Sequence, residues 1–246
     1  MSMAPVAPKR LEGRKVAAVA CFDSFGKLAM TLLAACRREG AETTLHLLEL
    51  NNRALSRRQR LEIRRIDPRT RIEKHNWSDL HNLGSPMAGS VDALILGLDG
   101  RRSRDALLQL HGAWSHSTSR PRLISAYPGI LFRFALEGML DRSGADLLCL
   151  NSQQDLSLYQ KGCAALGLDS SNAVVTGLPI LWRTHPRTEF PEKPSIVFFE
   201  QPSIPVHPLQ RRFVCEQLGD LSAAWPNHSV IFKPRTSSIE STLHRR

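Results

Sequence analysis

The sequence predicts an α/β protein in which a doubly wound parallel-sheet domain precedes an incomplete second domain of the same kind. Short apolar runs alternate with amphipathic segments of helical length, which is the pattern of consecutive βαβ units. The alternation breaks at the proline-rich residues 183–194 and then resumes. The composition, 42% hydrophobic and 23% charged over 246 residues, is that of a globular protein and excludes disordered and collagen-like chains.

The first strand and helix illustrate the repeating unit. Residues 15–21 read KVAAVAC, an apolar run typical of a strand that is buried on both faces. Apolar residues between Phe25 and Cys36 then recur at helical spacing. This spacing predicts an amphipathic helix that Ser24 caps and Gly40 ends.

The remaining elements of residues 12–182 follow the same logic and complete a Rossmann-like domain. We expect a parallel sheet of six or seven strands with helices on both faces. Further strands are predicted at 43–50, 71–77, 91–98, 123–126, 145–150 and 173–176, and helices at 54–66, 105–114 and 151–166.

Residues 183–194 are predicted to be a linker, and 195–246 to be the beginning of a second Rossmann-like domain. Strands are expected at 195–199 and 229–232, on either side of a helix at 208–225 whose buried face carries Val214, Leu218, Leu221 and Trp225. One βαβ unit cannot cover both faces of its own sheet, so we expect this domain to be C-terminally truncated.

Charge and cysteine content narrow the functional classes. The formal net charge of +10 favours an anionic partner, such as nucleic acid, an acidic membrane surface or a phosphorylated small molecule. The five cysteines are scattered and odd in number, which disfavours a disulfide scaffold or a zinc ribbon. The sequence shows neither a signal peptide nor an apolar run of membrane-spanning length. We therefore expect a cytoplasmic protein.

Several motifs with known chemistry are missing from the sequence. It lacks the patterns G-x-x-x-x-G-K-[ST], G-x-G-x-x-G, H-E-x-x-H and G-x-S-x-G, which disfavours P-loop NTPases, the usual NAD dehydrogenases, zincins and α/β-hydrolases. His111 and His116 are five residues apart, off the i, i+4 spacing of a helical metal pair. We expect no metal site and no cofactor.

Polar residues follow the predicted strands, at the edge where open α/β sheets bind ligands. Asp23 comes directly after the first strand, where it is a candidate general base or a helix cap, and Asp99 is the alternative base after the strand at 91–98. Each of the remaining candidates has a simpler interpretation as turn or cap chemistry. The candidate substrate-binding residues are Ser24, Lys27, Asn151, Ser152 and Gly177.

The segment 54–66 is strongly basic, with a thin apolar seam of Leu55, Leu61 and Ile66. It is interpreted as a solvated helix or as a peripheral contact with an anionic membrane on the inner face of the plasma membrane. Nucleic acid is disfavoured because neither aromatic residues nor a known motif accompanies the charges. The arginines concerned are Arg57, Arg58, Arg60, Arg64 and Arg65.

In the second domain, Lys233 and Arg235 follow the strand at 229–232. Two cations at a strand end suit a diphosphate or phosphodiester, because arginine offers a bidentate fork and lysine a point charge. The alternative is a solvated surface pair. Polar residues also follow the strand at 195–199, in the sequence EQPSIP.

Four segments together resemble a family of bacterial glycosyltransferases of the GT-B type, a domain family of unknown function that is distantly similar to sialyl- and polysialyltransferases. They are ACFDSFGKLA (20–29), residues 144–182, FFEQPSIPVHPLQRRFV (198–214) and IFKPR (231–235) with the trailing Glu240, Thr242 and His244.

The resemblance implies sugar transfer from a nucleotide-sugar donor, linked to CMP or UDP, to a glycan or cell-surface polysaccharide acceptor. It implies two Rossmann-like domains facing a cleft, with the acceptor on the first and the donor on the second. Asp23 would be the acceptor-activating base, and no metal is required. The implied donor-binding residues are Gln201, Ser203, Lys233, Arg235, Glu240 and His244. Such an enzyme would continue for roughly 100 further residues.

Two other functions remain open. One is a non-catalytic nucleotide- or glycan-binding module of the same fold, which would bind without turnover. The other is a basic accessory protein that binds nucleic acid, whose affinity would fall steeply with salt.

Overall fold

The computed structural model describes residues 9–50, 54–130, 135–183, 193–199, 205 and 207–233. The chain divides into two compact units, Met1–Thr184 and His185–Arg246, and each is described by itself. None of the helices in these ranges is long and apolar enough to cross a membrane.

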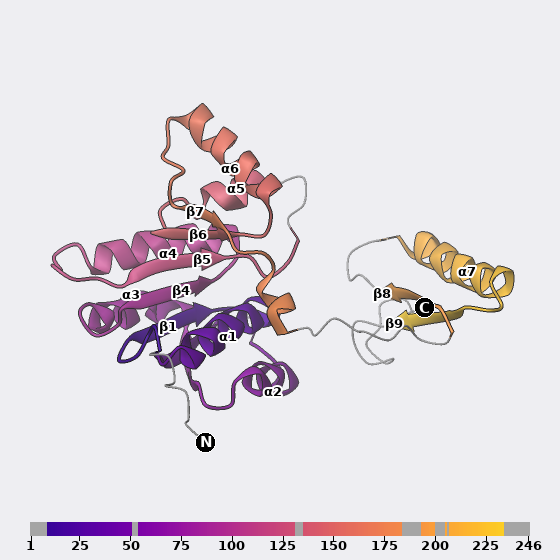
Figure 1. The fold of residues 1–246 in the computed structure, drawn as a ribbon, viewed down its shortest axis with the longest axis horizontal. Helices are drawn as coiled ribbons and strands as arrows, with labels where there is room; N and C mark the ends of the chain where they lie inside the picture. Colours follow the sequence, from indigo (N-terminus) through magenta and orange to yellow (C-terminus); the bar gives the residue numbers. More distant parts are fainter. Residues whose placement is uncertain are drawn as a thin grey trace, which may run out of the picture. The chain divides into compact units, whose positions relative to one another are not determined.

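In the described part of the first unit, seven strands form one parallel sheet in the order β3-β2-β1-β4-β5-β6-β7 (Figure 1). This confirms the predicted parallel sheet of six or seven strands. The strands are β1 (Lys15–Ala20), β2 (Glu42–Glu49), β3 (Arg71–Asn76), β4 (Ala93–Gly97), β5 (Arg122–Ala126), β6 (Leu147–Leu150) and β7 (Ala173–Val175).

Helices cover both faces of this sheet (Figure 1). Apolar side chains of α1 and α2 pack on one face, and those of α3 to α6 pack on the other. The helices are α1 (Asp23–Arg38), α2 (Arg57–Ile66), α3 (Leu80–Gly84), α4 (Gly100–Ala113), α5 (Ala135–Leu140) and α6 (Gln153–Leu166), with 3₁₀ turns at Trp77–Asp79, Ser85–Met87 and Pro179–Arg183.

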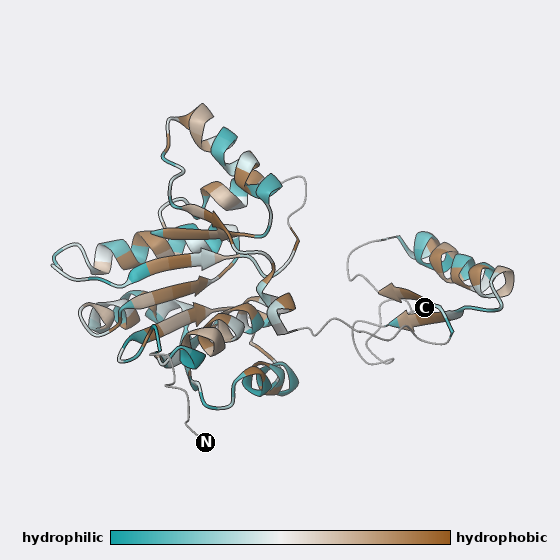
Figure 2. Ribbon diagram, in the orientation of Figure 1, coloured by the Kyte–Doolittle hydropathy of each residue, from teal (hydrophilic) through white to brown (hydrophobic). Residues whose placement is uncertain are grey.

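The core is centred on β1, whose residues 16–20 are all buried. Small side chains there let α1 approach the sheet closely. Gly97, at the end of β4, marks the tightest approach, because a Cβ at this position would lie 2.9 Å from the Phe25 carbonyl oxygen of α1. Figure 2 shows the strands largely in the hydrophobic colours, whereas α2 is mostly hydrophilic.

Several local expectations are corrected. Helix α1 begins at Asp23, with Phe22 in the N-cap position, so Ser24 lies inside the helix and does not cap it. Helix α4 begins at Gly100, five residues earlier than expected, because the Asp99 carboxylate caps it. On α2, Leu61 is 48% exposed and Ile63 is fully buried, so the docking face includes Ile63 in place of Leu61.

The short helices α3 and α5 were not predicted, because five or six residues are too few to show a helical period. The expected end of α1 is confirmed: Gly40 follows it with φ +100°, a conformation that favours glycine.

The second unit contains β8 (Ser195–Phe199), α7 (Pro208–Ala224) and β9 (Ser229–Lys233). Within its described residues, β8 and β9 pair in parallel, and Phe198 stacks on Phe232 with ring centroids 5.8 Å apart. Val214, Leu218 and Leu221 are partly buried, as expected. Trp225 is 49% exposed and packs on His228, so it does not belong to a buried face of α7.

Candidate functional site

The candidate site lies at the carboxyl ends of β1 and β4. In the sheet, β2 and β4 are the two neighbours of β1. From β1 the chain continues to β2, whereas from β4 it continues in the opposite direction, to β5. The connections after these two neighbouring strands therefore diverge, and open α/β sheets bind ligands in the crevice at such a switch point. Asp23 follows β1 and Asp99 follows β4, so the fold places both predicted carboxylates there.

The connection from β1 to α1 is strained. Phe22 has φ 63° and ψ 159°, a backbone region that is almost confined to glycine and that costs about 1–3 kcal/mol for other residues. The guanidinium of Arg102 lies 4.9 Å from the centre of the Phe22 ring and covers it. Strain of this kind concentrates at functional sites, and here it orients the first turn of α1.

Asp23 has one carboxylate oxygen engaged and one unused. Its Oδ2 accepts a hydrogen bond from Lys27 Nζ at 2.9 Å, while Oδ1 is buried and has no partner among the described residues. Lys27 also donates to Glu62 Oε2 of α2 at 2.7 Å. Partial burial works to lower the pKa of Lys27, but the hydrogen bonds to Glu62 and Asp23 outweigh it and raise the pKa. The charged lysine therefore holds the Asp23 carboxylate in place.

Asp99 is engaged at both oxygens. Its Oδ1 accepts from the backbone N–H of Arg102 at 3.0 Å, and its Oδ2 pairs with the Arg102 guanidinium. Asp99 thus caps α4, whereas α1 has no side-chain cap hydrogen bond in the described structure. Asp23 therefore does not have the helix-cap role that the sequence allowed for it, because it lies inside α1 and makes no cap hydrogen bond.

Cys21 lies beside these groups but is not set up as a nucleophile. Its backbone N–H donates to the Gly97 carbonyl at 3.3 Å. Burial, together with the nearby charge of Asp99, raises the pKa of the Cys21 thiol to about 12. The thiolate is the reactive form, so Cys21 is a packing residue here.

The other predicted substrate-binding residues lie on the same edge of the sheet. Ser24 is exposed on the first turn of α1, next to Asp23. Asn151 and Ser152 follow β6: the Asn151 amide donates to the carbonyl of Gly129, and Ser152 Oγ caps α6 by accepting from the backbone N–H of Asp155 at 3.1 Å. Gly177, after β7, has φ +74°. These three residues therefore shape the loops at the carboxyl ends of β6 and β7.

A buried arginine, which the sequence does not reveal, connects the ends of β4 and β5. Arg142 is 2% exposed and donates to the Leu98 carbonyl at 2.6 Å, to Tyr127 Oη at 3.2 Å and to the Gly138 carbonyl. Its guanidinium lies 4.3 Å from the centre of the Tyr127 ring. Burial lowers the pKa of Arg142 and raises that of Tyr127 to about 12. Nothing in the local sequence distinguishes Arg142 from surface arginines.

Most of the predicted donor-binding residues lie outside the described residues: Gln201, Ser203, Arg235, Glu240 and His244. Lys233 is described and is exposed at the end of β9. The pairing of Phe199 with Lys233 brings the ends of β8 and β9 to the same edge of their sheet.

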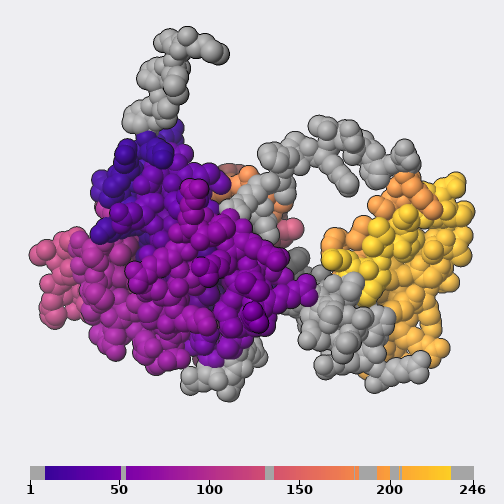
Figure 3. All heavy atoms as spheres, turned by 90° about the horizontal axis from the view of Figure 1, so that it is seen from below, coloured from indigo at the N-terminus to yellow at the C-terminus, as the bar shows by residue number. Residues whose placement is uncertain are grey.

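The arginines of α2 form an exposed basic face. Arg57, Arg64 and Arg65 are exposed, while Arg58 pairs with Glu62 at 3.1 Å and Arg60 donates to the Leu55 carbonyl. α2 lies at the bottom of the first unit in Figure 1, and the violet surface that includes it faces the viewer in Figure 3.

A second cluster of functional side chains lies elsewhere, on β2 and β3, and consists of His46, Glu73 and His75. The spacing of histidines along a helix, such as that of His111 and His116, does not indicate this cluster, because its members lie on two strands. Glu73 and His75 lie two residues apart on a predicted strand, which indicates that they share one face. That His46 joins them follows only from the pairing of β2 with β3.

Comparison with known families gives one family model, described as "Putative glycosyltransferase (DUF6716)", which matches residues 16–246. A comparison with curated protein sequences gives no significant match.

Solved structures resemble the chain at low sequence identity. A putative UDP-N-acetylglucosamine 2-epimerase from Listeria monocytogenes matches with TM-score 0.62 and 16% identity, over 92% of this chain and 64% of the epimerase. LpCGTa in complex with UDP matches with TM-score 0.52 and 13% identity, over 89% of this chain and 70% of that one. The lipopolysaccharide outer core galactosyltransferase WaaB matches with TM-score 0.50 and 12% identity, over 92% of this chain and 69% of WaaB.

These likenesses concern the fold, which is the GT-B type in the neighbours. The chain spans a little under two thirds of the length of the epimerase.

Proposed function

This chain belongs to the DUF6716 family of glycosyltransferases, and we propose that it transfers a sugar from a nucleotide-sugar donor to a glycan hydroxyl with inversion at the anomeric carbon. The observation that carries this proposal is Asp23. Its Oδ1 is unused at the switch point of the sheet, on a turn fixed by the strained Phe22 and by Lys27. Asp99, whose two oxygens both engage Arg102, is less available.

The proposed reaction is a single displacement. The acceptor hydroxyl oxygen attacks the anomeric carbon of the donor, a new C–O bond forms, and the bond from that carbon to the phosphate oxygen breaks. The hydroxyl proton passes to the Asp23 carboxylate, whose side chain is partly exposed, and the nucleotide leaves with the bonding electron pair. A general base positioned in this way typically raises the reaction rate 10²–10⁴-fold. Lys27 keeps Asp23 oriented and so preserves the attack geometry.

The donor is proposed to bind the second unit. Lys233, at the end of β9, is the described residue that supports this, because its ammonium suits the charge that develops on the leaving phosphate. Arg235, Gln201, Ser203, Glu240 and His244 are proposed to complete the donor site. We place UDP ahead of CMP because a structure of similar fold was solved with UDP. A glycan or cell-surface polysaccharide is the proposed acceptor class.

The test is a screen of UDP- and CMP-linked sugars for nucleotide release in the presence of glycan acceptors. We expect Asp23→Asn to lower turnover by about 10²-fold or more while donor affinity, measured by calorimetry, is retained. Asp105→Asn is the matched control, because Asp105 is a half-exposed residue of α4 outside the candidate site, and the turnover of this variant should equal that of the wild type. Normal turnover in Asp23→Asn would remove Asp23 as the base, and saturable donor binding without turnover would favour the non-catalytic module.

We further propose that the protein is cytoplasmic and contacts anionic membranes peripherally through α2. Arg57, Arg64 and Arg65 support this, because they are exposed on one short helix. Juxtamembrane basic residues contribute about 1 kcal/mol each at an anionic surface. Strong binding of random duplex DNA would favour the nucleic-acid alternative.

A further inference from the structure

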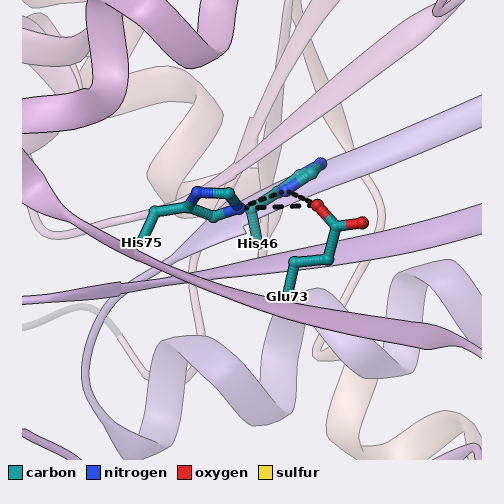
Figure 4. Close-up of side chains that lie close together, drawn as sticks. All are labelled: His46, Glu73 and His75. Atoms are coloured by element: carbon teal, nitrogen blue, oxygen red, sulfur yellow. Dashed lines mark hydrogen bonds and ion pairs between the residues drawn. The ribbon is translucent and has the colours of Figure 1, made fainter.

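Strand pairing brings three metal-ligating side chains together at one edge of the parallel sheet. β2 and β3 are in parallel register, with His46 opposite Glu73. His75 is two residues beyond Glu73 and so lies on the same face of β3. Figure 4 shows the three side chains converging from the two strands. The neighbouring Leu45 and Leu47 pack on the opposite face, beneath α1 and α2.

The three ligand atoms form a triangle of the size that a tetrahedral metal ion requires. His46 Nδ1 lies 3.1 Å from His75 Nε2 and 3.3 Å from Glu73 Oε2, and the latter two atoms are 3.5 Å apart. Bond lengths of ~2.0–2.1 Å to Zn²⁺ give tetrahedral ligand–ligand distances of about 3.3–3.4 Å. An octahedral ion with the same bonds would need about 2.9 Å.

Neighbouring residues fix the positions of the Glu73 and His46 side chains. Glu73 Oε1 is engaged by Arg71 Nε at 2.7 Å, which orients the carboxylate and leaves Oε2 directed at the two imidazoles. His46 is buried, and its position within β2 fixes its imidazole beside β3. Both features are those of a supported site.

A fourth position is available from an adjoining pocket of about 310 Å³. His46 and Glu73 line it together with Thr44, Met87 and Ser90. The pocket also reaches the first residues of β1 and β2, so it lies toward the amino ends of the strands, away from Asp23. A water molecule or a small ligand can enter the coordination sphere from this side.

We propose that His46, Glu73 and His75 bind one tetrahedral divalent metal ion of the first transition row, Zn²⁺ above all, with a water from the pocket as the fourth ligand. Two imidazoles and one carboxylate suit Zn²⁺, whereas Mg²⁺ and Ca²⁺ prefer oxygen ligands throughout. The ion would tie the edge strand β3 to β2. The site is independent of the proposed sugar transfer, because it uses other residues, which lie within β2 and β3 and not on the connections that follow β1 and β4.

Co²⁺ absorption of the chelator-treated full chain tests the proposal. One equivalent of Co²⁺ should give the intense d–d bands of tetrahedral coordination without a thiolate-to-cobalt charge-transfer band, which excludes the cysteines. Zn²⁺ should displace the Co²⁺, and an excess of Mg²⁺ or Ca²⁺ should not.

The variants His75→Gln and Glu73→Gln should weaken Co²⁺ binding at least about tenfold, since each removes a ligand. Both residues are partly exposed, which favours folding of the variants, and circular dichroism checks this. His116→Gln, at an exposed histidine, is the matched control and should bind like the wild type. Absence of tetrahedral bands, a thiolate band, or unchanged binding in the two folded ligand variants would each overturn the proposal.

Discussion

Replacing Gly97 with alanine tests how the fold positions the candidate site. The new Cβ would lie 2.9 Å from the Phe25 carbonyl oxygen, 3.1 Å from Ala20 Cβ and 3.2 Å from Ala29 Cβ. None of these three atoms is at the end of a flexible side chain, so none can rotate away. Helix α1, which carries Asp23 on its first turn, must therefore move from the sheet by several tenths of an ångström.

The expected cost follows from two opposing effects. Overpacking of this kind destabilises the fold by about 1–3 kcal/mol. Replacing glycine with alanine also reduces the conformational freedom of the unfolded chain, which stabilises the fold by about 0.5–1 kcal/mol. We expect a net decrease of about 1–2 kcal/mol in the free energy of unfolding. For a chain of this size that corresponds to a fall of roughly 2–8 °C in Tm.

Thermal unfolding followed by circular dichroism measures the change, and hydrogen exchange should show it at the first turn of α1. The control is Gly112→Ala in α4, where an added Cβ meets nothing within 4 Å. That variant should be as stable as the wild type or more stable by up to ~1 kcal/mol, because alanine favours helix. Equal stability of the two variants would refute the close approach of α1 to β4.

Three further predictions concern stability and membrane contact. The Asp146 carboxylate accepts from Arg120 and from the backbone N–H of Leu123, which holds its pKa below the usual value. Asp146→Asn should therefore lower the unfolding free energy by about 1–2 kcal/mol at neutral pH. The difference should shrink as pH falls below ~3.9, the unfolded pKa, and vanish only below the depressed pKa of the folded state; a difference independent of pH would contradict this. Arg142→Met should lower the free energy of unfolding in urea by about 2–5 kcal/mol, because the carbonyls of Leu98 and Gly138 lose a donor. Arg101→Met, at an exposed arginine of α4, should lower it by under ~0.5 kcal/mol. The combined change of Arg57, Arg64 and Arg65 to glutamine should weaken sedimentation with phosphatidylserine vesicles about a hundredfold, and unchanged sedimentation would exclude α2 as the contact.

Much of the first unit was predictable because its elements follow local patterns. The buried run of β1 and the helical spacing after it need no knowledge of the partners against which they pack. The strand ends were predicted from the same patterns, so Asp23 and Asp99 could be proposed as alternative bases before their contacts were known. The cap role of Asp99 was not predicted, because the helix that follows it was expected to begin only at residue 105.

The features that the sequence did not reveal depend on contacts between distant segments. The Arg142 guanidinium is buried because three separate carbonyl or hydroxyl groups meet it, and none of them is encoded near position 142 in a recognisable pattern. The His46, Glu73 and His75 cluster requires the register between β2 and β3. The positive φ of Phe22 runs against the ordinary preference of phenylalanine.

The stereochemistry of the product tests the central proposal most directly. If Asp23 takes the proton of the acceptor hydroxyl in a single displacement, the anomeric configuration of the transferred sugar must be opposite to that of the donor. The early product of a reaction with a defined nucleotide sugar can be followed by the coupling constant of its anomeric proton in NMR. Inversion, lost together with turnover in Asp23→Asn, is the predicted result. Retention of the donor's configuration would contradict the proposed role of Asp23.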